Sequence, residues 1–453
     1  MTGVSGIDRG RIAQLRARED EQFVARHPRS RELAADAQRS LLGGVPMNWM
    51  RRWPGPFPLF AAEAHGATVI DVDGIEYVDL CLGDTGAMTG HSPAPTVRAV
   101  RERLDRGITM MLPTDDALWV GDELARRFGL PRWQTAMTAT DANRFALRVA
   151  RRATGRTKVL VFNWCYHGTV DETLATLTDG SVGPRPGNVG PPVDPAHTTA
   201  VVEFNDVAAL ESILATGEIA AVLAEPALTN IGIVHPEPGF HDALRALTRE
   251  HGTLLIIDET HTICAGPGGV TRAERLEPDL FTIGKPIGGG IPIAAFGMTD
   301  DVADRVIADV STSDDADVSG IGGTLTGNAL SLAAVRATLG EVLTDAAYAH
   351  MVPLAERWAS GVADVIAAHG LPWHVNRLGC RAEYWFCPPP RTGGQAAAAV
   401  DHELDALLHL YALNRGILLT PFHNMALMCP ATTVDAVDRH TEVFADAVAE
   451  LTA

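Results

Sequence analysis

The chain has 453 residues, of which 46% are hydrophobic and 21% charged, and this balance is typical of a soluble globular protein. Its length exceeds what one simple core needs and suits a large domain with a smaller one. The formal net charge of −19 argues against a nucleic-acid partner, because no basic face is available to neutralise phosphates.

The amino terminus and the cysteines indicate a cytoplasmic protein. The first residues are polar and charged, unlike a signal peptide, and no apolar run of about 18 residues could span a membrane. The six cysteines form no CxxC pair and no Cys/His cluster with the spacing of a zinc site. We therefore expect reduced thiols, no metal and no membrane partner.

The first part of the chain predicts an arm, a loop and a hairpin. Residues 8–40 have the charge pattern of a surface helix that breaks at Pro28. Residues 43–60 are too rich in proline and glycine for regular structure. An Asp-Gly turn between two alternating runs then predicts a hairpin over 67–80.

From about Met111 the pattern becomes α/β. Predicted helices over 116–128 and 141–153 alternate with apolar runs rich in β-branched residues. These runs are Lys158–Phe162, Thr199–Glu203, Ala220–Ala224, Leu254–Ile257, Leu280–Ile283 and Ile293–Gly297. Such alternation predicts a mostly parallel sheet with helices on both faces, in which ligands bind at the carboxyl ends of the strands.

The C-terminal third predicts an α+β small domain that also takes in the N-terminal hairpin. Long helices are expected over 329–344, 347–369 and 433–451, with strands and one further helix between the last two. The predicted organisation is an N-terminal arm with part of the small domain over 1–110, a large domain over 111–335 and a C-terminal small domain over 336–453.

The stretch from Leu254 to Gly290 carries the strongest chemical signal. Its first buried run ends in Asp258 and Glu259, and Lys285 follows a second buried run and precedes a proline and three glycines. A carboxylate at the end of a buried strand and a lysine in a glycine-rich turn are both costly to build. A lysine that forms a Schiff base with pyridoxal phosphate, with a carboxylate to keep the ring nitrogen protonated, requires such a pair. The alternative, a strand cap and a surface lysine, does not explain the two together.

Two segments, DET at 258–260 and TIGKPIGGGIPIAAFG at 282–297, resemble the cofactor segment of class III, fold type I, aminotransferases that depend on pyridoxal phosphate. The resemblance is strongest to the glutamate-1-semialdehyde 2,1-aminomutase-like branch. It implies an α/β fold in which a large domain with a mostly parallel seven-stranded sheet is joined to an α+β small domain. It also implies pyridoxal 5′-phosphate (PLP) as cofactor and a homodimer with a shared active site.

The resemblance also assigns roles around the cofactor. Lys285 would form the Schiff base and move protons, and Asp258, rather than Glu259, would pair with the ring nitrogen. The other expected cofactor-binding residues are Thr138, Ala139 and Thr140 at a helix N-terminus, Tyr166 and His167 in CYHG, Glu225 and Asn230 in AEPALTNIG, and Thr324 in GGTLTGN. Thr324 would reach the phosphate of the partner subunit, although a helix N-cap is also a plausible role for it. Relatives carry glycine where Ala139 stands, which matters if this turn needs a positive φ.

The substrate side departs from the family pattern. An amino-acid substrate needs a cation for its carboxylate, and relatives supply an arginine from the loop that matches 45–52. Asn48 or Trp49 stands at that position here, and Thr85 replaces a family tryptophan. The predicted substrate-binding residues are Trp49, Arg51, Thr85, Arg381 and His423. They suggest a pocket for a larger or aromatic group, although packing alone would also explain the aromatic residues.

We therefore expect an aminotransferase that moves an amino group between an amino acid, such as a β-amino acid, or an aromatic amine and a keto acid. The reaction would run in ping-pong half-reactions through Lys285. The alternative is an intramolecular aminomutase of the glutamate-1-semialdehyde type, which needs no external acceptor. A non-catalytic homologue is a third interpretation, which the intact Lys285 and Asp258 disfavour, and racemase or decarboxylase chemistry on the same fold stays open.

Overall fold

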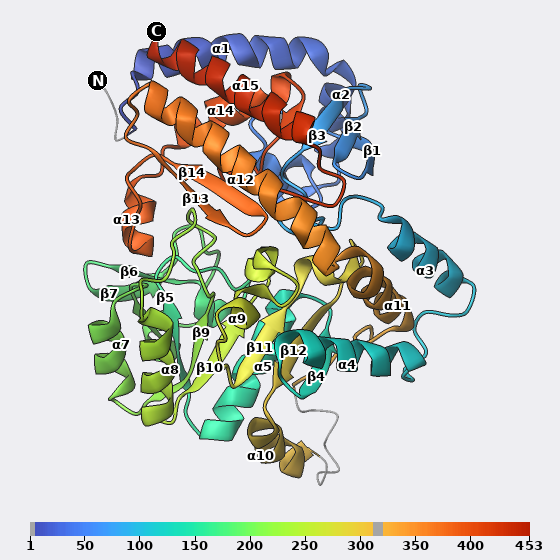
Figure 1. Cartoon of the computed structure of the whole chain (residues 1–453), viewed down its shortest axis with the longest axis vertical. Coiled ribbons are helices and arrows are strands. Elements are labelled where there is room, and N and C mark those ends of the chain that lie inside the picture. Colours follow the sequence, from blue (N-terminus) through green and yellow to red (C-terminus); the bar gives the residue numbers. More distant parts are fainter. Residues whose placement is uncertain (1–4, 311–319) are drawn as a thin grey trace. The chain divides into compact units, whose positions relative to one another are not determined.

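The computed structural model describes residues 5–310 and 320–453, which form two compact units. The large unit comprises Ala94–Asp345 and Pro390–Ala397. The small unit comprises the described residues up to Pro93, Ala346–Pro389 and Ala398–Ala453. Figure 1 labels the elements of both units. Within the described ranges, no helix combines the length and the apolar character that crossing a bilayer would require.

A seven-stranded sheet forms the centre of the large unit. Its strand order is β4-β12-β11-β10-β9-β5-β8, and β12 runs antiparallel to both of its neighbours while the other pairs are parallel. The strands are β4 Arg132–Ala136, β5 Lys158–Phe162, β8 Thr199–Val202, β9 Ile219–Ala224, β10 Leu254–Asp258, β11 Leu280–Ile283 and β12 Ala294–Met298. The mostly parallel α/β fold and all six predicted strands are confirmed, and β4 is an addition.

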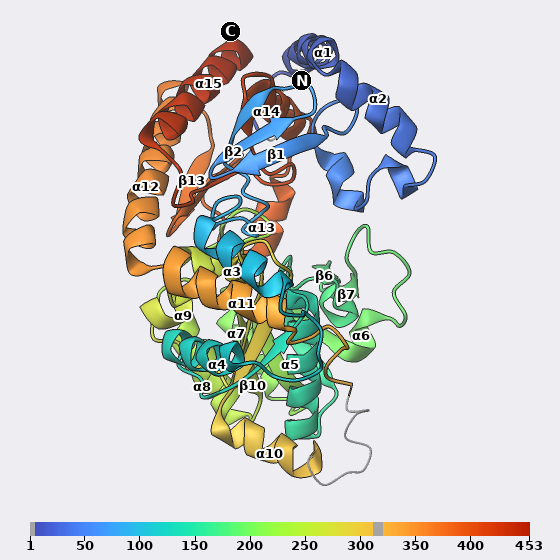
Figure 2. The same cartoon turned by 90° about the vertical axis from the view of Figure 1, so that its right-hand side faces the viewer.

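The central strands are buried on both faces. Every residue of β9, β10 and β11 is buried, which explains why these strands are continuous apolar runs rather than alternating ones. Helix α5 (Ala139–Thr154) packs on one face, and α7 (Val207–Leu214) and α8 (Phe240–Glu250) pack on the other, as Figure 2 shows. The parallel pairing brings the carboxyl end of β10, with Asp258, beside the ends of β9 and β11.

The other elements of the large unit surround this sheet. The helices are α3 Ala94–Leu104, α4 Asp115–Phe128, α6 Pro195–Thr198, α9 Gly269–Ala273, α10 Asp300–Val310 and α11 Ala329–Ala337, and the 3-10 helices are η3 Asp171–Thr173, η4 Thr262–Ala265 and η5 Lys285–Gly288. Strands β6 (Ala175–Thr178) and β7 (Ser181–Pro184) form a separate hairpin. The sequence predicts one helix over 329–344, but α11 gives way to a π-helical turn, η7 (Thr338–Val342).

The small unit contains two sheets. One has the order β1-β2-β3-β15, with β1 Ala61–His65, β2 Thr68–Asp71, β3 Glu76–Asp79 and β15 Ile417–Leu418. The other has the order β13-β14-β16, with β13 His374–Leu378, β14 Arg381–Trp385 and β16 Met425–Leu427. Strands β2 and β3 form the predicted hairpin, and β15 pairs in parallel with β3, so the N-terminal hairpin joins the C-terminal part as predicted.

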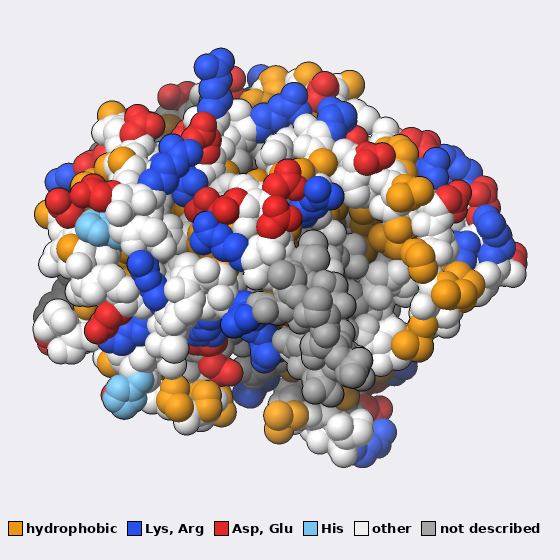
Figure 3. All heavy atoms as spheres, turned by 90° about the horizontal axis from the view of Figure 1, so that it is seen from below, with side chains coloured by type: hydrophobic (Ala, Val, Ile, Leu, Met, Phe, Trp, Pro, Cys, Tyr) orange, Lys and Arg blue, Asp and Glu red, His pale blue; other side chains and the backbone are white. Residues whose placement is uncertain are grey.

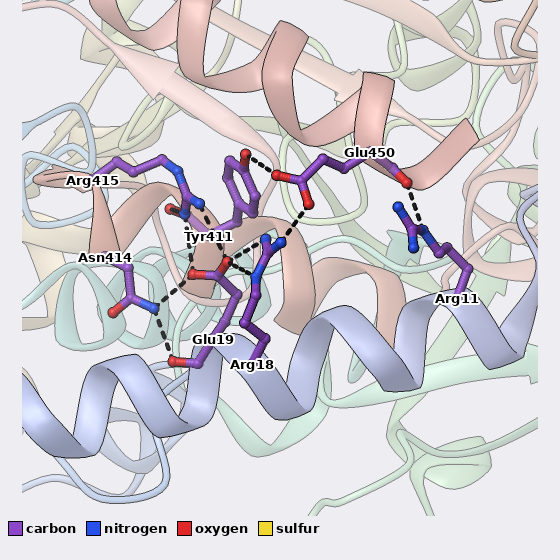
Figure 4. Close-up of polar contacts among 7 residues, drawn as sticks. All are labelled: Arg11, Arg18, Glu19, Tyr411, Asn414, Arg415 and Glu450. Atoms are coloured by element: carbon purple, nitrogen blue, oxygen red, sulfur yellow. Dashed lines mark hydrogen bonds and ion pairs between the residues drawn. The ribbon is translucent and has the colours of Figure 1, made fainter. Parts of the chain in front are cut away.

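Helices pack around these sheets. They are α1 Arg9–Arg26, α2 Pro28–Ala37, α12 Asp345–Ala368, α14 His402–Asn414 and α15 Val434–Thr452; short elements are η1 Leu42–Gly44 and η2 Asn48–Arg52. All but the last residue of α13 (Gly393–Ala398) belong to the large unit. The predicted break at Pro28 is confirmed, because α1 ends two residues before it. Figure 4 shows how side chains of α1, among them Arg18 and Glu19, reach polar partners on α14 and α15.

The boundaries of the units differ from the predicted domain boundaries at 110 and 335. Helix α3 packs against α11, so residues 94–110 and the whole α11–η7 segment belong to the large unit. Residues 390–397 return to the large unit as well, where the N–H of Gly394 donates to Glu203 over 3.2 Å. Contacts between segments far apart in the chain set these boundaries, so a local sequence pattern cannot predict the boundaries.

Candidate active site

Lys285 lies in a strained turn at the carboxyl end of β11. The 3-10 helix η5 holds it at φ +44, a left-handed conformation that non-glycine residues rarely adopt, and its side chain is partly buried. Gly289 and Gly290 follow at φ +57 and +100, values that favour glycine. Backbone strain of this kind persists only where the surroundings hold it, and it is frequent at functional sites.

Two threonines support the back of this turn. Thr96 of α3 and Thr338, the first residue of the π-helical turn, lie with their hydroxyl oxygens 2.8 Å apart, and both are buried. A Cβ atom on Gly289 would stand 2.6 Å from the Thr338 hydroxyl and 2.9 Å from that of Thr96. The turn therefore sits directly on this hydroxyl pair.

Close glycine contacts also bring the start of α5 next to the Lys285 turn. A Cβ on Gly284 would lie 3.0 Å from the Cβ of Ala139, and one on Gly168 would lie 2.1 Å from Oγ1 of Thr140. The same Thr140 hydroxyl accepts a hydrogen bond from the N–H of Thr169 over 3.0 Å. The structure thus brings together three segments that the sequence singled out, around residues 139, 168 and 285.

The start of α5 can hold an anion. Thr138 caps the helix, with its hydroxyl accepting from the N–H of Asp141 over 3.1 Å. The first N–H groups of a helix have no acceptor within it, and the helix dipole adds positive potential there. Ala139 begins the helix and does not have a positive φ, so its replacement of glycine puts no strain on this turn.

Asp258 is buried and held in one orientation. Its Oδ2 accepts a hydrogen bond from Nδ2 of Asn143 over 2.8 Å and lies 2.9 Å from Nδ1 of His167, while Oδ1 accepts from the N–H of Thr260 over 3.0 Å. Asn143 is fixed in turn by the hydroxyl of Thr282, which donates to its Oδ1 over 2.6 Å. Asn143 and His167, from two other segments, and the nearby Thr260 therefore converge on one carboxylate.

This network keeps both members of the Asp258–His167 pair charged. Burial alone would raise the pKa of Asp258, but the hydrogen bond and charge of His167, with Thr260 and Asn143, lower it to about 2. Burial likewise opposes protonation of His167, but Cys165 and Asp258 raise its pKa well above 6.5. An imidazolium and a carboxylate are therefore paired inside the large unit.

Two buried polar atoms beside Asp258 make no hydrogen bond of good geometry among the described residues. They are Nε2 of His167 and Oγ1 of Thr260, on residues that are only 1% and 5% exposed. A buried polar group without a partner costs about 1–3 kcal/mol. The cluster is thus suited to a polar ligand that contributes its own hydrogen-bonding groups.

Glu259 faces a different set of partners. Its Oε1 accepts from the N–H and the hydroxyl of Thr271 at 2.5 and 2.6 Å, and its Oε2 accepts from the hydroxyl of Thr262 at 2.5 Å. Burial raises the pKa of Glu259. Because its oxygens are engaged in holding η4 and α9, Glu259 acts as a structural carboxylate, and Asp258 is the acid that meets α5.

Glu225 ties together the two loops that carry Tyr166 and Asn230. Its Oε1 accepts from the N–H of Tyr166 over 3.2 Å, and its Oε2 accepts from the hydroxyl of Thr229. Burial raises the pKa of this carboxyl. Glu225 therefore holds the backbone on which Tyr166 and His167 are presented.

The remaining predicted residues belong to other segments of the chain. Thr324 is exposed in the turn before α11, and the cap of that helix is Asn328, so the N-cap alternative for Thr324 is wrong. The predicted substrate residues Trp49, Arg51, Thr85, Arg381 and His423 all belong to the small unit.

Within the small unit, two of these residues meet on a glutamate that the sequence did not flag. Arg381 donates to Oε2 of Glu383 over 2.9 Å, and Nδ1 of His423 lies 3.3 Å from Oε1 of the same carboxylate. Burial opposes ionisation of Glu383, but Arg381 and His423 lower its pKa overall. Arg381 is fully buried, and its Nη2 is the nitrogen that pairs with Glu383.

Two residues of the 45–52 loop, Trp49 and Arg52, contact the ring of Phe422 in the small unit. Trp49 meets the Phe422 ring edge-on, with centroids 6.3 Å apart, and the guanidinium of Arg52 lies 5.5 Å from the ring centroid. Arg51 instead packs over Gly43, where a Cβ would be 3.0 Å from its Cδ. The cation of this loop that meets an aromatic ring is therefore Arg52, next to the predicted Arg51.

Sequence reasoning also missed Asn143, the residue that holds Asp258. A signal was present, because Asn143 lies on the face of α5 that also buries Ala146, Leu147 and Ala150. A polar residue on an apolar helix face needs a buried partner. Only the fold identifies that partner, since Asp258 is 115 residues further along the chain.

Amines are scarce in this chain. Its only lysines are Lys158 and Lys285. Lys158, the first residue of β5, is partly exposed and lies 3.0 Å from Glu218 in an ion pair. Lys285 follows β11, the strand that pairs with β10, and it is therefore the lysine on the Asp258 side of the sheet.

Comparisons with known proteins agree with this geometry. The family model described as aminotransferase class-III matches residues 49–447. The chain is 33% identical over 415 residues to the glutamate-1-semialdehyde 2,1-aminomutase of Desulfitobacterium hafniense, covering 90% of this chain and 95% of the relative. A glutamate-1-semialdehyde-aminomutase structure from Pseudomonas aeruginosa PAO1 has 51% identity and a TM-score of 0.97, and the match covers 98% of this chain and all of that one.

This chain belongs to the class-III aminotransferase family. A β-phenylalanine aminotransferase from Variovorax paradoxus is a more distant solved relative, with 28% identity, 97% coverage of each chain and a TM-score of 0.86. These class-III relatives have the fold type I architecture, as predicted.

The cofactor is PLP, as expected for a class-III aminotransferase. A lysine-to-alanine variant of the Pseudomonas protein is known in complex with PMP. The residues present here fit such a group: a helix N-terminus suits its phosphate, a buried carboxylate suits its ring nitrogen, and a lysine follows the next strand. The two unpartnered polar atoms beside Asp258 agree with this fit.

Proposed function

We propose that this enzyme is an aminomutase of the glutamate-1-semialdehyde 2,1 type, which moves an amino group between adjacent carbons of one substrate. The observation that carries the proposal is the 51% identity over 98% of the chain to the Pseudomonas aminomutase, together with the 33% identity to the aminomutase of Desulfitobacterium. The sequence patterns alone favoured an aminotransferase and gave the aminomutase as the alternative. These identities support the aminomutase, which is now the preferred interpretation.

The cofactor contacts follow from the large unit. Lys285 would hold PLP through its amine and, after substrate has bound, would move the proton at the reacting carbon. Asp258 would pair with the ring nitrogen, and the start of α5, with Thr138, Ala139 and Thr140, would bind the phosphate. PLP supplies an electron sink that stabilises negative charge on that carbon.

Other predicted residues keep supporting roles in the proposal. His167 would hold Asp258 in position and keep its carboxyl group ionised, as their 2.9 Å contact supports. Glu225 positions the loop of Tyr166, whose ring would stack on PLP, and Asn230 would lie near the phenolic oxygen. The substrate contacts Trp49, Arg51, Thr85, Arg381 and His423 remain proposals, and Arg381 already donates from its Nη2 to Glu383.

A second candidate is an aminotransferase that uses an external keto acid. It is favoured by the departures from the aminomutase pattern at Trp49 and Thr85 and by the likeness to the β-phenylalanine aminotransferase. The aromatic contact of Trp49 with Phe422 is consistent with an aromatic amino donor.

Turnover without an acceptor separates the two. The holoenzyme would be incubated with glutamate-1-semialdehyde alone, and the isomer with its amino group on C1 would be quantified. Many product molecules per active site support the aminomutase. Release of one equivalent of deaminated carbonyl product per active site, with further turnover only after pyruvate or 2-oxoglutarate is added to take up the amino group, would establish transfer. No reaction with the semialdehyde, but turnover of an aromatic β-amino acid with keto acid, would overturn the aminomutase.

The role of Lys285 can be tested directly because only two lysines are present. Borohydride reduction of the holoenzyme, followed by peptide mass spectrometry, should find the cofactor attached to Lys285. Lys285→Ala should abolish turnover without changing the fold, whereas the matched control Lys158→Ala should keep activity. Attachment at Lys158, or full activity of Lys285→Ala, would refute the assignment.

We also propose a homodimer with a shared active site, in which Thr324 reaches the partner. Exposed apolar side chains on the large unit support it, notably Met111 at 83% and Leu112 at 71% exposed. Met111, Leu112 and Thr324 line one groove of about 700 Å³. Figure 3 shows hydrophobic side chains gathered on one side of a face that is otherwise mixed in charge. Light scattering should give twice the chain mass, and Met111→Asp should weaken the dimer.

A further inference from the structure

We propose that Thr260 is a positioning residue for the cofactor: its hydroxyl donates to Oδ1 of Asp258 in the holoenzyme, shares that oxygen with the ring nitrogen, and so lowers the proton affinity of the nitrogen. The inference rests on the proposed pairing of Asp258 with PLP. It goes beyond that pairing, because it assigns control of the ring's protonation to a second residue.

The geometry places the Thr260 side chain at the right oxygen. The N–H of Thr260 already donates to Oδ1 of Asp258 over 3.0 Å, so its side chain starts beside that atom. The other oxygen, Oδ2, is occupied by Asn143 and His167. Oδ1 accepts one hydrogen bond among the described residues, so it is the less occupied oxygen and the one that a ring nitrogen and the Thr260 hydroxyl would share.

The Thr260 hydroxyl makes no well-formed hydrogen bond with any other described residue. It is also buried. The neighbouring threonines behave differently, since Thr262 and Thr271 donate to Glu259 and Thr282 donates to Asn143. A buried hydroxyl without a partner is unfavourable, so a rotation about χ1 that brings it onto Oδ1 gains free energy.

The expected effect follows from the charge on the carboxylate. Each donor to a carboxylate disperses its negative charge and lowers its attraction for a proton. Thr260 is among the groups, after burial and His167, that set the pKa of Asp258. With a less basic partner, the ring nitrogen holds its proton less tightly, and the strength of the ring as an electron sink depends on that proton. The charged or titratable groups that face Asp258 are His167 and, at longer range, Glu225.

The test measures the ring nitrogen itself rather than turnover. Wild type and Thr260→Val would be loaded with PLP labelled with ¹⁵N in the ring, and the ¹⁵N shift would be followed as a function of pH. Valine has the shape of threonine without its hydroxyl. We expect the proton affinity of the nitrogen to rise by roughly threefold to tenfold in Thr260→Val, the range that one hydrogen bond to a carboxylate supports. If the nitrogen stays protonated throughout, the limiting shift is compared instead.

Two matched variants complete the test. Thr260→Ser keeps the hydroxyl and should restore the wild-type titration. Thr262→Val removes a buried threonine hydroxyl from Glu259 in the same segment and should lower the melting temperature without moving the ¹⁵N titration. Identical ¹⁵N behaviour in wild type and Thr260→Val would overturn the inference. Failure of the wild type to bind PLP would instead overturn the proposed function, so the two failures are distinguishable.

Discussion

The imidazole of His167 and the carboxylate of Asp258 form a charged pair inside the large unit. Nδ1 and Oδ2 are 2.9 Å apart, and neither side chain is more than 4% exposed. The pKa of His167 is raised well above 6.5, and that of Asp258 is lowered to about 2. The pair therefore presents an anion of fixed position at the carboxyl end of β10 over the whole neutral range.

Removal of the imidazole should leave a buried carboxylate without its counter-charge. We expect His167→Ala to lower the free energy of unfolding of the cofactor-free protein by about 3 kcal/mol, near the low end for a broken buried ion pair because Asn143 still donates. Urea unfolding measures this change. A loss below about 0.5 kcal/mol would show that the pair contributes little.

The same pair predicts a pH dependence of stability. His167 has a raised pKa, so its contribution is present below the unfolded-state pKa of histidine and is lost as pH rises through the folded-state value. Asp258 has a lowered pKa, so its contribution is present above the unfolded-state pKa of aspartate and is lost as pH falls toward about 2. The stability difference between wild type and His167→Ala should therefore be largest from mildly acidic to neutral pH and shrink at both extremes. A difference that is constant with pH would contradict the assigned charges.

The ion-pair network of Figure 4 should stabilise the small unit. Glu19 on α1 is fully buried and accepts from Asn414 at 2.8 Å, Arg18 at 2.7 Å and Arg415 at 3.0 Å. Glu19→Ala leaves these donors without their acceptor. Because both arginines are partly solvated, we expect the free energy of unfolding to fall by about 2 kcal/mol.

An exposed pair on α2 provides the control for Glu19. Glu32 lies 2.8 Å from Arg29, and both side chains are more than half exposed. Glu32→Ala should change the free energy of unfolding by no more than about 0.5 kcal/mol. Equal effects of Glu19→Ala and Glu32→Ala in urea unfolding would show that burial does not strengthen the α1 network.

The support under the Lys285 turn predicts a difference between two adjacent glycines. Gly289 and Gly290 both have positive φ, but a Cβ on Gly289 would stand 2.6 Å from Oγ1 of Thr338, whereas one on Gly290 would meet nothing within 4 Å. Gly290→Ala should cost about 1 kcal/mol of backbone strain, and Gly289→Ala about 2 kcal/mol more from overpacking.

PLP retention after gel filtration gives a functional measure of the same turn. Gly289→Ala should release the cofactor faster, because the turn that carries Lys285 must move, while Gly290→Ala should retain it. Adding Thr338→Ala to Gly289→Ala removes the clashing hydroxyl and should recover part of the loss. No recovery would mean that the contact with Thr338 is not the cause.

Ala139 should be the better residue at the start of α5, despite the glycine in relatives. It is the first helical residue and has no positive φ, so glycine offers no conformational advantage there. We expect Ala139→Gly to lower stability by about 0.5 kcal/mol, within the known cost of glycine in a helix, and to leave PLP affinity unchanged. A gain in affinity would indicate that the cofactor needs more room at this position.

Local patterns predicted most of the fold and singled out the main candidate residues of the site. The strands β5, β9, β10 and β11 were identifiable because burial on both faces leaves a continuous apolar run. Lys285 and Asp258 stood out because each is a polar residue directly after such a run. Strand β4, with exposed and buried residues alternating, gave a weaker signal and was missed.

The resemblance to a known family favoured Asp258 over Glu259, and the tertiary structure supplies a physical reason for that preference. Both acids follow the same strand, and only their partners differ: Asn143 and His167 meet Asp258, whereas Thr262 and Thr271 meet Glu259. The same holds for Arg381, which the sequence offered as a substrate ligand but which the fold pairs with Glu383.

The sequence by itself determined the order of the elements and the sheet type, and it singled out Lys285 and the acidic pair Asp258 and Glu259 as candidates, because these depend on contiguous runs and on turns of a few residues. The tertiary structure alone decided which polar groups are charged, which are already paired and which remain available, as Thr260 does beside Asp258. Those properties depend on burial and on distances between atoms of segments that lie more than a hundred residues apart, such as Asn143 and Asp258.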